Sequence, residues 1–163
     1  MQIRSDDFLD SLPVLVKHEV RFIVVGGVCA VLHGAPVTTF DLDIVHSRSS
    51  ENLHRLVLAL TELEAYYRGH PGKRLKPDAQ SMSSSGHHLL MTKSGPLDVL
   101  GTIGNQHDYE ELLAHTEIIS TGEMQLRILT LEHLIRIKEE SSHEKDRFVL
   151  SILKSILKEK NRL

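Results

Sequence analysis

The sequence has no tryptophan, few other aromatic residues and a single cysteine, and each shortage excludes something. Aromatic residues make up 4% of the 163 residues, so the hydrophobic core must be built from aliphatic side chains. Cys29 has no partner for an internal disulfide, which is typical of a protein kept in a reducing compartment. The cysteine and the histidines of this chain do not show the spacing that is typical of a zinc site. We therefore expect an aliphatic core with neither a disulfide nor a zinc site.

Long apolar runs and a strong charge of one sign are also missing. The longest nearly apolar run, residues 22–32, is too short to cross a bilayer, and the first ten residues carry acids where a signal peptide is apolar. A net charge of −3 gives no global basic field for nucleic acid. The chain length leaves room for one domain over residues 1–163 and little room for two. These features predict a cytoplasmic single-domain protein with no membrane partner.

Hydrophobic spacing and turn residues predict an α/β (α+β) fold, in which a short mixed β-sheet with hairpins is covered by helices. Ser5 is predicted to cap an opening helix that Pro13 splits or kinks, and a loop over residues 68–87 holds one helical turn started by Pro77. The strands are expected at residues 21–25, 39–45, 88–92, 96–101, 116–120 and 124–129. The other helices are expected at 27–33, from Ser49 or Ser50 to 63, at 108–115, from Thr130 to 138, and from Ser141 or Ser142 into a fraying Lys-rich tail.

The stretch FIVVGGVCAVLHGAPVTTFDLDIV, residues 22–45, is the most informative part of the chain. An apolar strand runs into Gly26 and Gly27, and thirteen residues later a second apolar strand carries Asp41 and Asp43. Because side chains alternate faces along a strand, both carboxylates point the same way, where they repel each other unless a cation neutralises them. Asp98 lies in a third strand-like run. Carboxylates on a sheet edge beside a glycine turn suit a divalent metal and a nucleotide.

Each of these features has a structural alternative. A glycine pair between a strand and a helix often serves the backbone alone, and the absence of a third glycine at G-x-G-x-x-G spacing argues against dinucleotide binding. The acids could be solvated residues of an edge strand. Thr39 could be β-branched strand filler, or its hydroxyl could touch phosphate or orient Asp41.

The glycine pair, the gap and the Asp-Leu-Asp-Ile run resemble the signature of the nucleotidyltransferase superfamily that shares the DNA polymerase beta catalytic fold. The chain is most similar to the small bacterial toxin-like branch, related to the transferase half of abortive-infection toxin–antitoxin pairs. That branch carries an HG, a T-x-DLDI run, a G-x-LDVL strand, and a late helix with a Lys and a KD pair. The matching segments here are 33–34, 39–44, 95–100, Lys138 and Lys145-Asp146. The resemblance covers about residues 20–155, which it implies as the core of a single domain spanning 1–163.

The resemblance implies a transferase that moves NMP from an NTP to a hydroxyl with release of pyrophosphate. Asp41, Asp43 and Asp98 are implied as ligands of Mg²⁺ or Mn²⁺, and Asp98 also as the base for the attacking hydroxyl. The implied nucleotide-binding residues are Gly26, Gly27, Thr39, Lys138, Lys145 and Asp146, the last orienting the two lysines. His143 stands where relatives often carry Arg.

Three functions remain open at this point. The first is the active transferase, with a tRNA end, a protein side chain or a small molecule as acceptor. The second is a catalytically silent nucleotide-binding or partner-binding module of the same fold. The third is a toxin restrained by an antitoxin protein, which shares the chemistry of the first. The cations Arg68, Lys73, Arg74 and Lys76 could clamp triphosphate or acceptor, although solvated loops commonly carry such charges.

Overall fold

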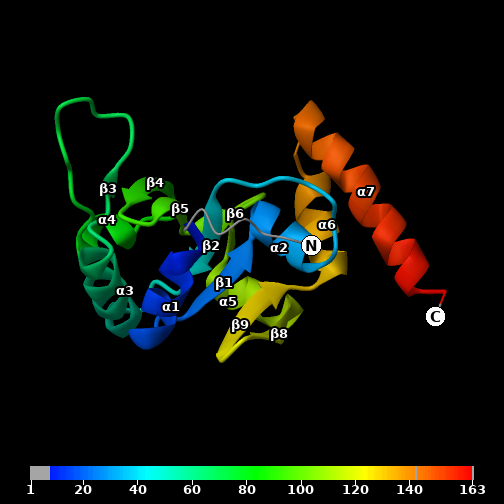
Figure 1. Ribbon diagram of the computed structural model, residues 1–163, viewed down its shortest axis with the longest axis horizontal. Coiled ribbons are helices and arrows are strands. Elements are labelled where there is room, and N and C mark those ends of the chain that lie inside the picture. Colours follow the sequence, from blue (N-terminus) through cyan, green and yellow to red (C-terminus); the bar gives the residue numbers. More distant parts are fainter. Residues whose placement is uncertain (1–7, 142, 163) are drawn as a thin grey trace.

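A seven-stranded mixed sheet forms the centre of the computed structural model, which describes residues 8–141 and 143–162 (Figure 1). Its strand order is β3-β4-β5-β2-β1-β9-β8, and β6 and β7 form a separate two-stranded ribbon. The central strand β2 runs antiparallel to β1 and parallel to β5. The strands are β1 (Phe22–Val25), β2 (Leu42–His46), β3 (Tyr66–Tyr67), β4 (His87–Thr92), β5 (Gly95–Leu100), β6 (Thr102–Ile103), β7 (His107–Asp108), β8 (Thr116–Thr121) and β9 (Met124–Leu129).

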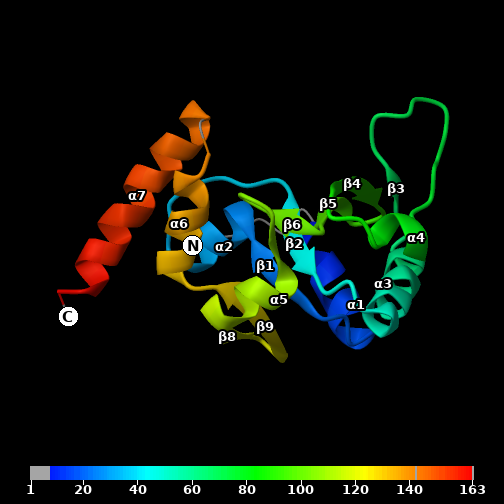
Figure 2. The ribbon, with the colours of Figure 1, turned by 180° about the vertical axis from the view of Figure 1, so that it is seen from behind.

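The helices divide into two groups on either side of the central strands. α6 and α7 lie on one side of the molecule, and α3, α4 and the long loop that precedes α4 lie on the other, in both views (Figures 1 and 2). The described α-helices are α1 (Ser11–Lys17), α2 (Gly26–Leu32), α3 (Ser50–Glu62), α4 (Ala79–Met82), α5 (Tyr109–Leu112), α6 (Leu131–Glu139) and α7 (Glu144–Lys160). Short 3₁₀ turns, Phe8–Asp10 and Leu113–His115, precede α1 and follow α5. The predicted α+β fold is confirmed.

Alternating burial in the central strands separates the core from the site. Leu42 and Ile44 of β2 are fully buried, as are Leu97 and Val99 of β5. The residue between each pair is an aspartate that faces the opposite side of the sheet. The aliphatic side chains therefore anchor two neighbouring strands, and the carboxylates are held at one place by that packing. The core is mainly aliphatic, as the shortage of aromatic residues predicted, and Phe8, Phe22 and Tyr109 are its buried aromatic residues.

Helix caps explain several of the element boundaries. The Ser49 hydroxyl accepts a hydrogen bond from the Asn52 amide at 3.3 Å, and Thr130 caps α6 in the same way, so both predicted caps are confirmed. The short helix before β4 is not started by Pro77. It begins after Asp78, whose carboxylate accepts from the Ser81 amide in a capping box.

Other predicted boundaries were wrong. Pro13 lies in the first turn of α1, where its missing N–H has no partner to lose. The acid-bearing strand begins at Leu42 instead of residue 39, so Asp41 immediately precedes it. The last helix begins at Glu144 with His143 as its N-cap, beyond the predicted Ser141, and it extends to Lys160.

Some features lay outside what the sequence pattern predicted. The strand β3 and the ribbon β6–β7 are two-residue elements, too short to show a hydrophobic period. Ser5 and Ser142, two of the predicted helix caps, lie outside the described residues. None of the helices in residues 8–141 and 143–162 combines the length and the apolar content needed to cross a membrane.

Candidate active site

The glycine pair at the end of β1 lies against the acid-bearing segment. A Cβ atom on Gly26 would come 2.2 Å from Asp43 Oδ2, and a Cβ on Gly27 would come 2.6 Å from Thr39 Oγ1. Gly26 also has a φ of +66°, a conformation that other residues rarely adopt. Close approach therefore explains the absence of a side chain at both positions, and at Gly26 the backbone conformation explains it as well. The sequence alone could not separate these two reasons.

Asp43 is the most perturbed carboxyl group of this site. Burial raises its pKa to about 8, helped by the negative charge of Asp98, a hydrogen bond with that residue and the charge of Asp41, while Lys138 opposes the rise. No described group donates a hydrogen bond to its buried Oδ1 atom. A buried carboxylate oxygen without a donor is costly, and a bound cation would remove the cost. A strongly perturbed acid next to a glycine turn is a candidate for a functional site.

Asp98 stands directly beside Asp43. The parallel pairing of β2 with β5 sets the two aspartates in register, so their side chains leave the same face of the sheet on adjacent strands. Asp98 Oδ1 accepts a hydrogen bond from Arg68 Nη2 at 2.7 Å. Arg68 Nη1 also donates to the Leu90 carbonyl at 2.9 Å, which holds the guanidinium between β4 and the acid. One oxygen of Asp98 is therefore engaged by a cation of this chain.

Asp41 and Thr39 complete the segment. The Thr39 hydroxyl donates to the backbone carbonyl of Asp41 at 3.3 Å, and this bond fixes the backbone just before β2. Asp41 acts on Asp43 through its charge. In the described part of the chain, no three His, Cys, Asp or Glu side chains are arranged as a ready-made metal cluster. The structure thus brings Asp43 and Asp98 together as a pair, with Asp41 near them and Asp98 paired to Arg68.

The acid pair nevertheless fits a divalent cation. Mg²⁺ is usually held by one or two carboxylates together with waters and substrate phosphates, not by an all-protein cage. The buried oxygen of Asp43, the acid beside it and the close approach of the Gly26 backbone to the Asp43 carboxylate supply the protein's share of such a site. Both strands are inner strands of the sheet, so Asp43 and Asp98 are not solvated acids of an edge strand.

On the other side of the acids, two helices present a cation. Lys138 of α6 lies 3.4 Å from Asp146 Oδ1 of α7, and Ser141 donates to Asp146 Oδ2 at 2.6 Å. Lys138 and Ser141 together hold the pKa of Asp146 below its usual range against the opposing effect of burial. The charge of Lys138 also acts on Asp43. Lys145, one residue before Asp146, is exposed and makes no ion pair with the described residues.

The sequence did not predict the contacts that two residues of the site make. Arg68 was grouped with other loop cations, and nothing in its spacing showed that it would reach Asp98 from the far side of β4. Ser141 was expected only as a helix cap, and its hydroxyl instead supports Asp146. Both contacts join segments far apart in the sequence, and no local pattern could have revealed them.

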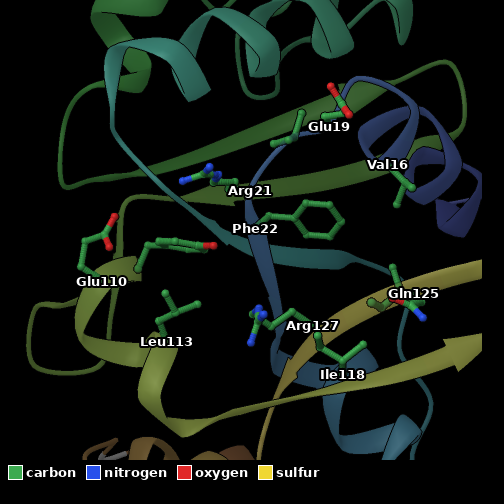
Figure 3. Close-up of a pocket in the computed structure, with 12 residues that line it drawn as sticks. Val16, Glu19, Arg21, Phe22, Glu110, Leu113, Ile118, Gln125 and Arg127 are labelled. Atoms are coloured by element: carbon green, nitrogen blue, oxygen red, sulfur yellow. The ribbon is translucent and has the colours of Figure 1, made fainter.

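A cavity of about 490 Å³ lies at the other end of β1, between α1, the α5 segment and the β8–β9 hairpin (Figure 3). Arg21 and Arg127 line it together with Glu19 and Glu110, so its charges balance. None of the glycines, acids or lysines described above is among its lining residues. This cavity is therefore separate from the candidate site.

Comparison with known proteins places this geometry in a known fold. No protein-family model and no curated protein sequence matches the chain. Among solved structures, TM1012 of Thermotoga maritima, a proposed nucleotidyltransferase, is similar with a TM-score of 0.58 at 14% identity, over 99% of this chain and 98% of its own. The fold is nucleotidyltransferase-like.

Two further structures have the same nucleotidyltransferase-like fold. The lincomycin-bound lincosamide antibiotic adenylyltransferase LnuA has a TM-score of 0.62 at 14% identity, over 96% of this chain and 99% of its own. An antigenic nucleotidyltransferase-like protein of Paracoccidioides brasiliensis has a TM-score of 0.52 at 16% identity, over 93% of this chain and 76% of its own. At such identities the likeness establishes the fold, and the chemistry of this chain rests on its own residues.

Proposed function

We propose that the protein is a metal-dependent nucleotidyltransferase that moves NMP from an NTP to a hydroxyl acceptor and releases pyrophosphate. The observation that carries this proposal is the acid pair Asp43–Asp98, set in register beside Gly26 with a buried oxygen that no described donor reaches. The similar fold of LnuA, an adenylyltransferase, supports NMP transfer as the class of reaction.

The donor nucleotide would bind on the α6 side of the acids. Gly26 and Gly27 carry no side chains that would keep the backbone away from the phosphates. Asp43 and Thr39 occupy the places where those side chains would lie. Lys138 supplies a positive charge, oriented by Asp146 and Ser141. Asp41, Asp43 and Asp98 would hold Mg²⁺ or Mn²⁺, which when bound neutralises charge on the transferring phosphoryl group and on the leaving pyrophosphate.

The acceptor hydroxyl would approach from the β5 side. Asp98 keeps one oxygen on Arg68 and can take the proton of the hydroxyl with the other. The acceptor oxygen then forms a bond to the α-phosphorus while the bond between the α-phosphorus and the pyrophosphate oxygen breaks. Arg68 acts as a positioning residue for Asp98, because its bond to the Leu90 carbonyl fixes the guanidinium.

Incubation with each labelled NTP, Mg²⁺ and cell extract tests the proposal. We expect one extract component to acquire label from at least one NTP, with release of pyrophosphate. An Asp41→Asn, Asp43→Asn double variant should transfer none. Label transfer that persists in this variant would show that the acids do not catalyse it and would contradict the proposal. No transfer and no thermal stabilisation by any NTP with Mg²⁺ would favour the catalytically silent module instead.

The toxin-like assignment is a finer proposal about the same chemistry. An antitoxin protein would then restrain the transferase in a bacterial cell. Growth arrest on expression of the wild-type protein, absent with the double variant, is the expected result. Equal growth of cells expressing the two proteins would contradict the assignment.

The two lysines should differ in their effect on NTP affinity. Lys138 acts on Asp43 and is held by Asp146, so we expect Lys138→Met to raise the Kd for a non-hydrolysable NTP analogue by about 10-fold or more, the loss of one charge-assisted hydrogen bond. Lys145→Met, at an exposed position, should change it by roughly 2-fold or less.

Isothermal titration with Mg²⁺ present measures both constants, with Lys158→Met on the far part of α7 as the control. A larger loss for Lys145→Met than for Lys138→Met would place the first turn of α7 on the phosphates, as the motif resemblance implies.

A further inference from the structure

A cationic loop, residues 68–76, projects from the β3 end of the sheet, well away from the body of the protein in both views (Figures 1 and 2). The segment from residue 65 to residue 77 contains no acid, although the whole chain has a net charge of −3. The loop carries four positive side chains and a histidine: Arg68, His70, Lys73, Arg74 and Lys76. This is a strong local positive charge in a weakly acidic protein, and such a charge attracts anionic groups.

Hydrogen bonds give the loop a defined shape. The Tyr67 amide donates to the Leu75 carbonyl at 2.9 Å and closes the base of the loop, and the Lys73 amide donates to the His70 carbonyl at 3.0 Å near its tip. The Arg74 guanidinium lies 4.7 Å from the centre of the Tyr66 ring. The residues from Tyr66 to Arg74 line an open hollow of about 690 Å³. The loop is thus a concave basic surface with an aromatic side chain at its base.

The first residue of the loop reaches the proposed active site. Arg68 binds Asp98 through its side chain, and its amide donates to the carbonyl of Leu89, the residue paired with Asp98 across β4 and β5. In the strand order, β5 and β4 lie between the loop and the acid of β2, while β1 and its glycine pair lie on the other side. The acids therefore separate the donor side, with Gly26 and Lys138, from the loop.

We propose that the cationic loop binds the phosphates of a single-stranded nucleic acid whose terminal hydroxyl lies at Asp98. The inference rests on the proposed function, and it names the acceptor class. A nucleic-acid strand has a terminal hydroxyl followed by phosphates at regular intervals. The hydroxyl would lie at Asp98 and the phosphates along the cations of the loop. Aromatic and arginine side chains beside a basic groove are the usual platform for single strands. The small net charge of the whole chain favours a short end over a long duplex.

Equilibrium binding of a short, 5′-fluorescent single-stranded RNA with a free 3′-hydroxyl tests the proposal without any transfer reaction. The variant Lys73→Gln, Arg74→Gln, Lys76→Gln removes three exposed charges from the loop. The control variant Lys158→Gln, Lys160→Gln, Arg162→Gln removes the same residue types from the end of α7 and beyond it.

Fluorescence anisotropy over a salt series should show wild-type binding that the loop variant weakens by roughly 10- to 50-fold. The slope of log Kobs against log salt should become shallower by about 2, since each lost phosphate contact accounts for about 0.7. The control variant should change neither quantity appreciably. An equal loss in both variants would overturn the loop as the site, and so would tighter binding of acidic peptides or phosphatidylglycerol vesicles than of RNA.

Thermal stabilisation by NTP with Mg²⁺ tests the transferase proposal independently of the proposal for the loop. The loop variant should retain the wild-type shift, because its charges lie on the acceptor side. A wild-type protein that is stabilised by NTP but binds no RNA would overturn the acceptor assignment and leave the transferase intact. RNA binding without any effect of NTP and metal would support the loop and contradict the transferase.

Discussion

The variant Asp43→Asn should lose transfer by at least ~10³-fold and yet be more stable than the wild type when no metal is present. The loss of activity follows from removing one charge of the acid pair that is proposed to hold the metal, since charge neutralisation is the main requirement of phosphoryl transfer. Asn keeps the size and shape of Asp, so the packing of β2 should not change. Transfer of labelled NMP and thermal unfolding of the metal-free protein measure the two effects.

The gain in stability has a defined pH dependence. Burial and the neighbouring charges raise the pKa of Asp43 to about 8 in the folded protein, against 3.8 for an unperturbed group. Because the folded state holds this proton more tightly, its stabilising effect is full below about pH 4 and is lost as the pH rises through about 8. The variant lacks this titration. At about pH 8 to 9, its free energy of unfolding should therefore exceed that of the wild type by a few kcal/mol, roughly 5–10 °C in Tm. The difference should be much smaller at about pH 5.

Glu123→Gln is the control for this comparison, because Glu123 is an exposed acid in the β8–β9 turn. It should change neither transfer nor the pH dependence of Tm. If Asp43→Asn lowers Tm at every pH while transfer survives, the acids have a structural role and the transferase proposal is wrong. Addition of Mg²⁺ with NTP should raise Tm in the wild type and have little effect in Asp43→Asn.

The second large effect is expected for Gly26→Ala. The new methyl group would lie 2.2 Å from Asp43 Oδ2, so the carboxylate must rotate away from its present position. A displacement of about 1 Å in a catalytic group can cost roughly 10²-fold in rate, and we expect a loss of that size or larger in transfer. The positive φ of the position adds a cost of about 1–2 kcal/mol to folding.

The variant Gly122→Ala separates the effect of backbone strain from the effect of displacing the Asp43 carboxylate. Gly122 has a φ of +60°, close to the +66° of Gly26, but a methyl group there would meet nothing within 4 Å. Both variants should lose stability through backbone strain, and only Gly26→Ala should lose transfer and NTP-dependent stabilisation. Equal transfer in the two variants would show that the close approach of Gly26 to Asp43 has no functional role.

Local chemistry determined much of the fold in advance. The alternation of Leu42, Asp43 and Ile44 predicts a strand with one apolar face, and that strand is central in the sheet. Side-chain oxygens at Ser49 and Thr130 predict helix starts, because such groups accept bonds from amides only a few residues ahead. Both signals act over short stretches of chain, and the strand and the two helix starts that they predict are present in the structure. The start of α7 had two candidate serines, and the helix began beyond both.

Only the tertiary structure decided which charged groups meet. The sequence singled out Asp43 and Asp98 by type, but their neighbouring positions follow from the parallel pairing of β2 with β5, strands joined by some fifty residues of chain. The contact of Arg68 with Asp98 and the support of Asp146 by Ser141 depend on the same long-range packing. The pKa of Asp43 depends on it as well, because burial and the charge of a neighbouring strand exist only once the sheet has formed.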